Sequence, residues 1–310
     1  MPDTTTHHPP VPPALVLGLA IFGISVSGPL VRLAHAPPLT IAAWRLGFSL
    51  CAIAAMLVYT GTWRQYRRLT RGDVLVALAA GASLALHFWS WIASISYTSV
   101  AASVVLVNLS PVIVALGSAA WLHERPTRAQ VAGIAIALAG AVLLAWGDAQ
   151  RATPGAGGGG FVLSSRALFG DLLAIAGAVT VSGYLLVGRR VRQKLDLWPY
   201  VGLVYGACFV CVVALAAAAG QPLTGYAPRE ITIFAGMALG PMLLGHTGFN
   251  WALRYRPAYV VSLVALGEPV GATVLAMLLP GIRETPNGAT LLGGAVLLAG
   301  VAYASRPRRS

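Results

Sequence analysis

Apolar residues run through this chain in long stretches, separated by short segments that hold most of the polar residues. Stretches of about 17 to 25 apolar residues are long enough to cross a bilayer as helices. The stretches are continuous and not alternating, which favours helices over the strands of a membrane barrel. The pattern therefore predicts an all-α membrane protein. Its ten predicted transmembrane helices cover residues 14–33, 39–59, 74–95, 100–122, 129–146, 168–187, 198–219, 231–253, 258–279 and 289–304.

Composition supports this interpretation, because 57% of the 310 residues are hydrophobic and only 10% are charged. Soluble proteins carry about 25% charged residues, so the surplus apolar surface is expected to face lipid. The net charge of +12 could suggest nucleic acid. However, the arginines lie between apolar runs and not on one soluble face, so no nucleic-acid partner is expected.

The basic residues are distributed unevenly among the connectors. Fifteen of the 21 Lys and Arg residues lie in connectors that would share a side with the N-terminus, five lie in the opposite connectors, and Arg45 lies within a span. Cytoplasmic loops of membrane proteins are enriched in Lys and Arg. Both termini are therefore predicted to be cytoplasmic, with a disordered N-terminal tail at 1–13 and a basic tail at 306–310.

The chain contains an internal repeat. When Pro111 is set against Pro269, Tyr97 meets Tyr255, and the helix that follows repeats its glycines at the same spacing. The two halves, 14–147 and 167–305, are joined by a Gly-rich linker at 148–166. Since each half has an odd number of spans, the second must enter the membrane in the opposite sense. The sequence thus predicts two inverted five-helix repeats, an arrangement typical of secondary transporters.

Two short motifs resemble those of a known family. Glu124-Arg125-Pro126 follows the fourth span, and Gly267-Glu268-Pro269-Val270 lies in the ninth. With ten spans in two halves, the chain resembles the EamA group of the drug/metabolite transporter superfamily. The resemblance implies transport of small solutes across the bacterial inner membrane, often outward. The chain departs from the repeat at Pro280-Gly281, which shifts the second copy of the Glu-Arg-Pro segment.

The third and eighth spans carry polar groups that a bilayer makes costly. His87, Trp91 and Ser94 share one face of the third span, and His246 and Asn250 are spaced i, i+4 in the eighth, beside Trp251. These residues are predicted to line a substrate path, although hydrogen bonding between helices and interfacial anchoring are alternatives. The His- and Trp-rich third span resembles YddG-type exporters of aromatic and other neutral amino acids.

Two charged residues lie deep within spans. Glu268 is the carboxylate in the ninth span and Arg45 the cation in the second. The two could simply form a buried ion pair. Alternatively, Glu268 could couple transport to protons or bind a substrate amine, and Arg45 could hold a substrate carboxylate.

Further polar and helix-breaking residues complete the set of candidates. Side chains predicted to contact substrate are Asn108, Tyr184, Tyr259 and Ser262, with helix packing as the alternative. Pro111 and Pro269 each remove a helical hydrogen bond, so they are predicted hinges or static kinks. The glycine faces of the fifth and tenth spans would allow close helix packing or a homodimer.

These features predict a secondary transporter that exports small metabolites, with aromatic and other neutral amino acids as the first expectation. Two inverted halves would rock about a midplane cavity, giving alternating access. A multidrug or cationic-metabolite exporter is one alternative, and an integral-membrane enzyme another. No catalytic residue, metal site or cofactor is expected, since catalytic, metal-ligand and nucleotide-binding motifs are missing from the sequence.

Overall fold

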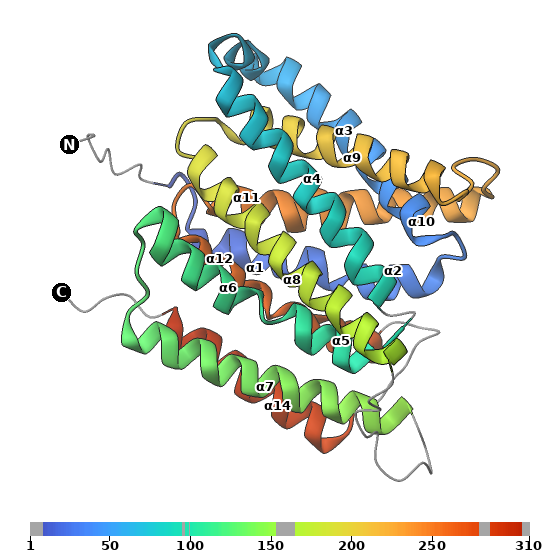
Figure 1. Cartoon of the computed structure of the whole chain (residues 1–310), viewed down its shortest axis with the longest axis vertical. Helices are drawn as coiled ribbons and strands as arrows, with labels where there is room; N and C mark the ends of the chain where they lie inside the picture. Colours follow the sequence, from blue (N-terminus) through green and yellow to red (C-terminus); the bar gives the residue numbers. More distant parts are fainter. Residues whose placement is uncertain (1–8, 95–96, 99, 153–164, 279–285, 306–310) are drawn as a thin grey trace.

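The computed structural model describes residues 9–94, 97–98, 100–152, 165–278 and 286–305. Most of the predicted linker and both ends of the chain, including the basic tail, lie outside these ranges, as does the insertion at Pro280-Gly281. Helices form the described part, and their order is shown in Figure 1. In the first half they are α1 (Pro13–Ser25), α2 (Ser27–Leu33), α3 (Pro38–Thr60), η1 (Thr62–Arg68), α4 (Arg71–Ser94), α5 (Val100–Val107), α6 (Ser110–Gly117), η2 (Ser118–Leu122) and α7 (Arg128–Ala152).

The second half repeats this order with small differences. It contains α8 (Ser165–Val191), α9 (Leu197–Ala218), α10 (Pro228–Met237), η3 (Ala238–His246), α11 (Thr247–Ala252), α12 (Ala258–Ala265), α13 (Glu268–Leu278) and α14 (Gly288–Ala304). The elements η2 and η3 are π-helical and η1 is a 3₁₀ helix. Several of the predicted spans are therefore assembled from two or three consecutive elements.

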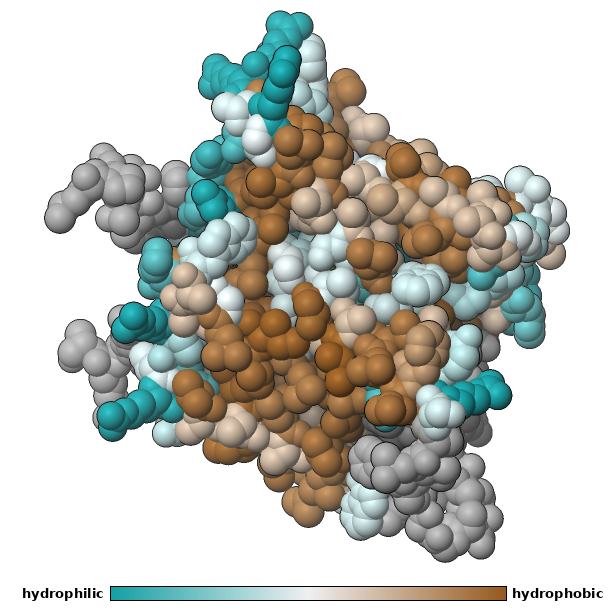
Figure 2. All heavy atoms as spheres, in the orientation of Figure 1, coloured by the Kyte–Doolittle hydropathy of each residue, from teal (hydrophilic) through white to brown (hydrophobic). Residues whose placement is uncertain are grey.

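Nine helices of the described residues are long and apolar enough to cross a membrane. A shorter apolar helix, α14, stands where the tenth span was predicted. Large hydrophobic side chains such as Leu75, Leu116 and Leu239 are more than 60% exposed. In Figure 2, hydrophobic residues cover much of the surface, and hydrophilic residues collect at its edges. These features identify a multi-pass membrane protein whose middle faces lipid.

The two halves pack against each other in a repeating pattern. The third span, α4, lies on α8 and α9, which are the sixth and seventh. Correspondingly, the eighth span contacts α1 through η3 and α11, and contacts α3 through α10 and η3. The third span of the first half thus packs on the first two spans of the second half, and the third span of the second half packs on the first two spans of the first half. The internal repeat of the sequence is thus expressed as a pseudo-twofold arrangement of helices.

Corresponding helices run in opposite directions. In the pair α7 and α14, Gly133 lies against Ala304, whereas Gly147 lies against Thr290 at the other end. Likewise, α3 and α9 place Gly47 near Phe209 and Leu57 near Gly202. Both pairs are antiparallel, as an inverted repeat requires. The glycine faces of α7 and α14 contact each other within one chain, and Figure 1 shows this pair along one side of the bundle.

Candidate functional site

Two spans break at the symmetric prolines. The fourth span is interrupted at Asn108 and Leu109 before α6, and the ninth at Leu266 and Gly267 before α13. Each proline lies at the first turn of the second segment, where its missing N–H costs least. The predicted kinks are therefore breaks between two helices. Movement at these breaks stays a prediction.

A serine from a neighbouring span contacts each break. Ser182 of α8 donates to the carbonyl oxygen of Ser110 at 3.3 Å, and Ser25 of α1 donates to that of Glu268 at 3.3 Å. Each hydroxyl also contacts the carbonyl four residues earlier in its own helix. Both acceptors precede a proline. The two halves thus tie their broken helices to the first and sixth spans with the same bond, which sequence analysis did not anticipate.

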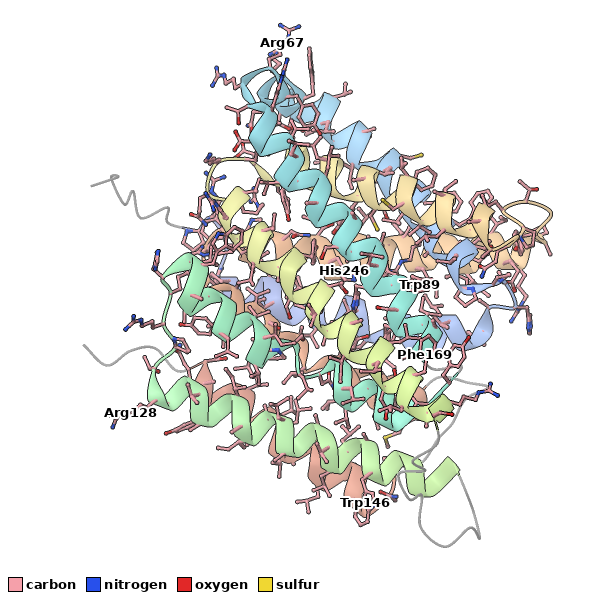
Figure 3. All side chains as sticks on the ribbon, viewed as in Figure 1. Arg67, Trp89, Arg128, Trp146, Phe169 and His246 are labelled. Atoms are coloured by element: carbon pink, nitrogen blue, oxygen red, sulfur yellow. The ribbon has the colours of Figure 1, made fainter. Side chains whose placement is uncertain are left out.

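Four residues meet in the interior, namely Arg45, His87, Phe88 and His246. With Glu268, which interacts electrostatically with Arg45, they form what we call the central cluster. The guanidinium carbon of Arg45 lies 4.0 Å from the Phe88 ring centre, a cation–π contact. The Phe88 ring also meets His246 edge-on, with ring centres 5.7 Å apart. Arg45 interacts electrostatically with His87, His246 and Glu268. Figure 3 shows His246 in the middle of the bundle, away from Arg67 and Arg128 at its edge.

The polar groups of the central cluster differ in how they are satisfied. His87 Nδ1 lies 2.9 Å from the carbonyl oxygen of Gly177 on α8. By contrast, the ring nitrogens of His246 and the carboxylate of Glu268 have no hydrogen-bond partner among the described residues. The Glu268 carboxylate interacts electrostatically with Arg45, but the two side chains form neither a hydrogen bond nor a close ion pair. The cluster therefore keeps unused donors and acceptors inside an apolar bundle.

A hydrogen-bonded group lies beside the central cluster, where the ring of Tyr184 meets the ring of His246 at 6.4 Å. The side-chain amide of Asn250 donates to the hydroxyls of Tyr184, at 2.5 Å, and Tyr205, at 3.2 Å. Tyr205 also contacts Thr247 at 3.2 Å. The role of Tyr205 was missed from sequence, although a tyrosine in an apolar span is a usable signal because its hydroxyl needs a partner.

The other predicted residues lie in different places. The Trp91 ring is parallel to that of His87, with centres 6.3 Å apart, so it adjoins the central cluster. Ser94 is bound to Ser103 at 2.6 Å, and Ser262 lies 3.5 Å from Ser110. Asn108, at the break of the fourth span, has a buried amide nitrogen without a partner. The structure thus gives Ser94 and Ser262 helix-bridging contacts.

Trp251 and Tyr259 lie outside the central cluster. The Trp251 ring packs on Tyr255, with ring centres 4.6 Å apart. The Tyr259 hydroxyl contacts Gln130 of α7 at 3.1 Å. Both contacts lie toward the connector between α11 and α12 and the start of α7. These two residues, which were predicted to contact substrate, therefore do not lie with the residues of the central cluster.

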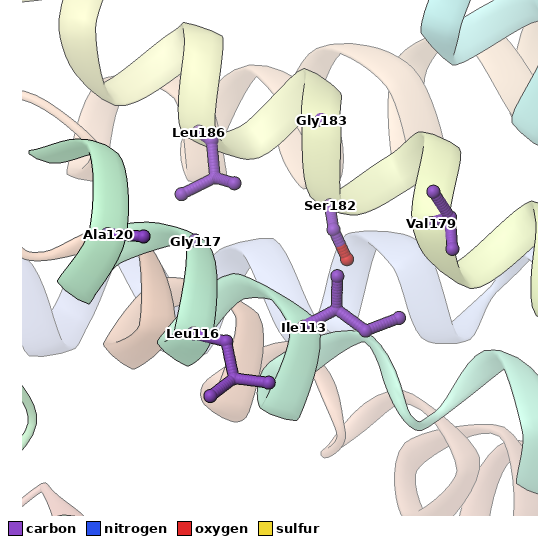
Figure 4. A pocket seen from close by; sticks show the side chains of 8 residues that line it. All are labelled: Ile113, Leu116, Gly117, Ala120, Val179, Ser182, Gly183 and Leu186. Carbon is purple, nitrogen blue, oxygen red and sulfur yellow. The ribbon is translucent and has the colours of Figure 1, made fainter.

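A groove on the surface lies apart from the central cluster, and Ser182 is part of its lining. It runs between α6, η2 and α8 and has a volume of about 480 Å³. Figure 4 shows its lining, which is mainly apolar and includes Leu116, Val179 and Leu186. None of the predicted substrate-binding residues lines it. Its apolar side chains make it a lipid-facing feature.

Four connectors are tied together on one face of the bundle. This basic face consists of η1 and residues 123–127, 192–196 and 253–257. Arg189 contacts Glu124 at 2.7 Å and donates to the carbonyl oxygens of Leu253, at 2.8 Å, and Arg254, at 3.0 Å. Arg254 pairs with Asp196 at 2.7 Å, and Gln65 donates to the same carboxylate at 2.5 Å. All four were predicted to lie on one side, and the structure places them together.

The Asp196 carboxylate holds connectors of the basic face together at neutral pH, because it is ionised there. Burial raises the pKa of Asp196, but hydrogen bonds from Gln65 and Arg254 outweigh burial, so its pKa lies below the usual value. A lowered carboxyl pKa adds stability above the unfolded-state pKa, and this stability is lost as pH falls through the folded-state pKa. The ties from Asp196 are therefore intact at neutral pH and weaken in acid.

The comparisons with known proteins agree with this geometry. The model of the EamA-like transporter family matches residues 12–146 and again residues 168–306. The chain belongs to the EamA-like transporter family. The two matches coincide with the two halves, and membership indicates a membrane transporter of small solutes. Among curated proteins, no match is found.

Solved structures share the fold. One, titled only "Crystal structure of protein", has a TM-score of 0.76 and 22% sequence identity, covering 94% of this chain and 96% of the other. A sequence identity of 22% shows that the two proteins share a fold and nothing more about function. Among the described residues, no group of three His, Cys, Asp or Glu side chains is placed to hold a metal ion.

Proposed function

We propose that this EamA-like protein exports small amphipathic metabolites, with aromatic and other neutral amino acids first, across the bacterial inner membrane. Its two inverted five-span halves would alternate access to the central cluster, with both termini in the cytoplasm. The observation that carries the proposal is that two unpartnered side chains, His246 and Glu268, interact with Arg45 beside the Phe88 ring, and that Glu268 lies at the break of the ninth span. Discontinuous helices at a repeat interface are typical of transport sites.

The chemistry of the central cluster favours an amino acid over an organic cation. A cation could bind the Glu268 carboxylate and the Phe88 ring, but the Arg45 guanidinium already covers that ring. A zwitterion offers opposite charges to both Arg45 and Glu268. Proton coupling through Glu268 would supply the energy. Flux into proteoliposomes across a panel of amino acids and organic cations tests this ranking, and flux of cations alone would reverse it.

We expect His246→Ala to lower amino-acid flux at least about 10-fold while leaving the protein folded, since the His246 ring nitrogens bind no described residue. The measurement is flux per folded protein, with folding followed by size-exclusion chromatography and thermal unfolding. His35→Ala is the matched control, because His35 is exposed and lies outside the cluster. Unchanged flux per folded protein with reduced stability would assign His246 to packing.

We further expect Arg189→Ala to loosen the basic face. Hydrogen bonds to charged groups contribute about 1.5 to 3 kcal/mol each, so losing this side chain should shift the closed population at least about 10-fold. A cysteine placed at buried Leu253, after the native cysteines are replaced, reports the opening through its rate of maleimide labelling. Arg190→Ala is the control, because Arg190 stacks on Trp121 instead. Equal labelling in both variants would contradict a gating role for Arg189.

A further inference from the structure

Arg45 has an unusual environment for a charged side chain. It lies on α3 and is only 7% exposed, yet its Nε and Nη2 atoms are buried without any hydrogen-bond partner. Burying charged donors without acceptors is strongly unfavourable, and proteins retain such groups mainly at functional sites. The free donors of Arg45 therefore call for an acceptor from outside the described residues.

The two free donors of Arg45 lie on the same edge of the guanidinium. The N–H bonds of Nε and Nη2 point in parallel along that edge, which is one of the edges that grips both oxygens of a carboxylate. The ring of Phe88 lies 4.0 Å from the guanidinium carbon and packs against the group. Arg45 thus presents two parallel N–H donors that could bind one carboxylate, and no described residue accepts a hydrogen bond from them.

The residues around Arg45 indicate which chemical groups a ligand bound to it would carry. Of the groups near Arg45, Glu268 is the carboxylate, and it accepts no hydrogen bond from the free edge. Glu268 leaves its carboxylate free for a positive group. The rings of His87 and Trp91, which are parallel, supply an aromatic wall nearby. A molecule with a carboxylate, an ammonium group and a ring complements all three.

We infer that the Nε–Nη2 edge of Arg45 is the element that binds the carboxylate of the transported solute. The inference rests on the proposed function and adds to it the group that the solute must carry. The edge is buried in this structure, so a movement of the surrounding helices must let the solute reach it. The Glu268 carboxylate then receives the ammonium group.

The experiment compares solutes that differ only in this group. Full-length protein in proteoliposomes takes up labelled L-phenylalanine, and unlabelled L-phenylalanine and phenylalaninamide compete with it. Because a site built to hydrogen-bond a substrate group rejects an analogue lacking it, the amide should compete at least about 100-fold less well. In Arg45→Gln, the two competitors should become equal within about threefold. Arg229→Gln, at an outer ion pair with Glu230, should keep the wild-type ratio.

Arg45→Lys provides a second variant if Arg45→Gln does not fold. Lysine keeps the charge but loses the two-pronged edge, so the ratio should fall to about 10-fold. A wild-type protein that moves phenylalanine but accepts the amide equally would overturn the inference and leave the proposed function standing. So would a ratio of about 100-fold that survives in Arg45→Gln.

A measurement without transport separates the two proposals. Purified protein is heated with 3-phenylpropanoate or with 3-phenylpropanamide, and the thermal unfolding midpoint is recorded. The acid, and not the amide, should raise the midpoint of the wild type and leave that of Arg45→Gln unchanged. If no amino acid is transported but this pattern is seen, the proposed substrate class fails while the carboxylate site stands. Equal shifts from both compounds would overturn the site.

Discussion

Gly140→Val is expected to abolish the folded protein or to lower its unfolding midpoint by at least about 6 °C. A β-carbon at Gly140 would lie 2.8 Å from the carbonyl oxygen of Gly293 and 2.6 Å from the Leu297 α-carbon. These are backbone atoms of α14, which cannot turn aside as a side chain could. The two helices must separate, and overpacking of this kind costs about 3 kcal/mol or more.

The matched control for Gly140→Val is Gly206→Val in α9. A β-carbon at Gly206 would meet nothing within 4 Å, and the position is likewise inside a long apolar helix. Expression, size-exclusion profile and unfolding midpoint in detergent should therefore stay near those of the wild type. If both variants behave alike, contact between α7 and α14 is not what stabilises the bundle.

Glu268→Gln is expected to reduce amino-acid flux about 10-fold to 100-fold, the loss that follows when one charge-assisted contact with a substrate ammonium is removed. The amide keeps the shape of the side chain, so the α13 helix and its serine contact should persist. The measurement is flux per folded protein at several pH values. A protein coupled through Glu268 should also lose the pH dependence of its flux.

Glu230→Gln is the control for Glu268→Gln. Glu230 is buried, whereas Glu268 is half-buried. The Glu230 carboxylate pairs with Arg229 and accepts from the backbone N–H of His35, outside the central cluster. Its variant should transport normally. Wild-type flux and an unchanged pH profile in Glu268→Gln would assign this carboxylate a structural role.

Membrane helices and their repeat could be predicted from local sequence. Long apolar runs have no stable exposure to water, so they specify membrane spans without any knowledge of neighbours. The spacing of Pro111 and Pro269 fixed the alignment of the halves, and the arginines of the connectors fixed which loops share a face. The predicted residues His87, His246, Arg45 and Glu268 were found because charge and imidazole are rare in apolar helices.

Periodicity could not place side chains relative to other helices. Trp251 and Tyr259 satisfied the same polarity criterion as His246, but the structure turns them toward Tyr255 and Gln130. The serine bonds from Ser25 and Ser182 to the broken spans join residues 243 and 72 positions apart in sequence. Such contacts depend on helix rotation and register, which one residue of offset changes by about 100°.

By itself, the sequence determined that this protein lies in a membrane, that it is built of two opposed halves, and which buried groups are polar. Those properties follow from composition and spacing along the chain. Only the tertiary structure decided which polar groups remain without partners, because satisfaction of a buried donor depends on atoms from other helices. It assigned His87 a carbonyl on α8 and left the Arg45 edge and the Glu268 carboxylate unbonded.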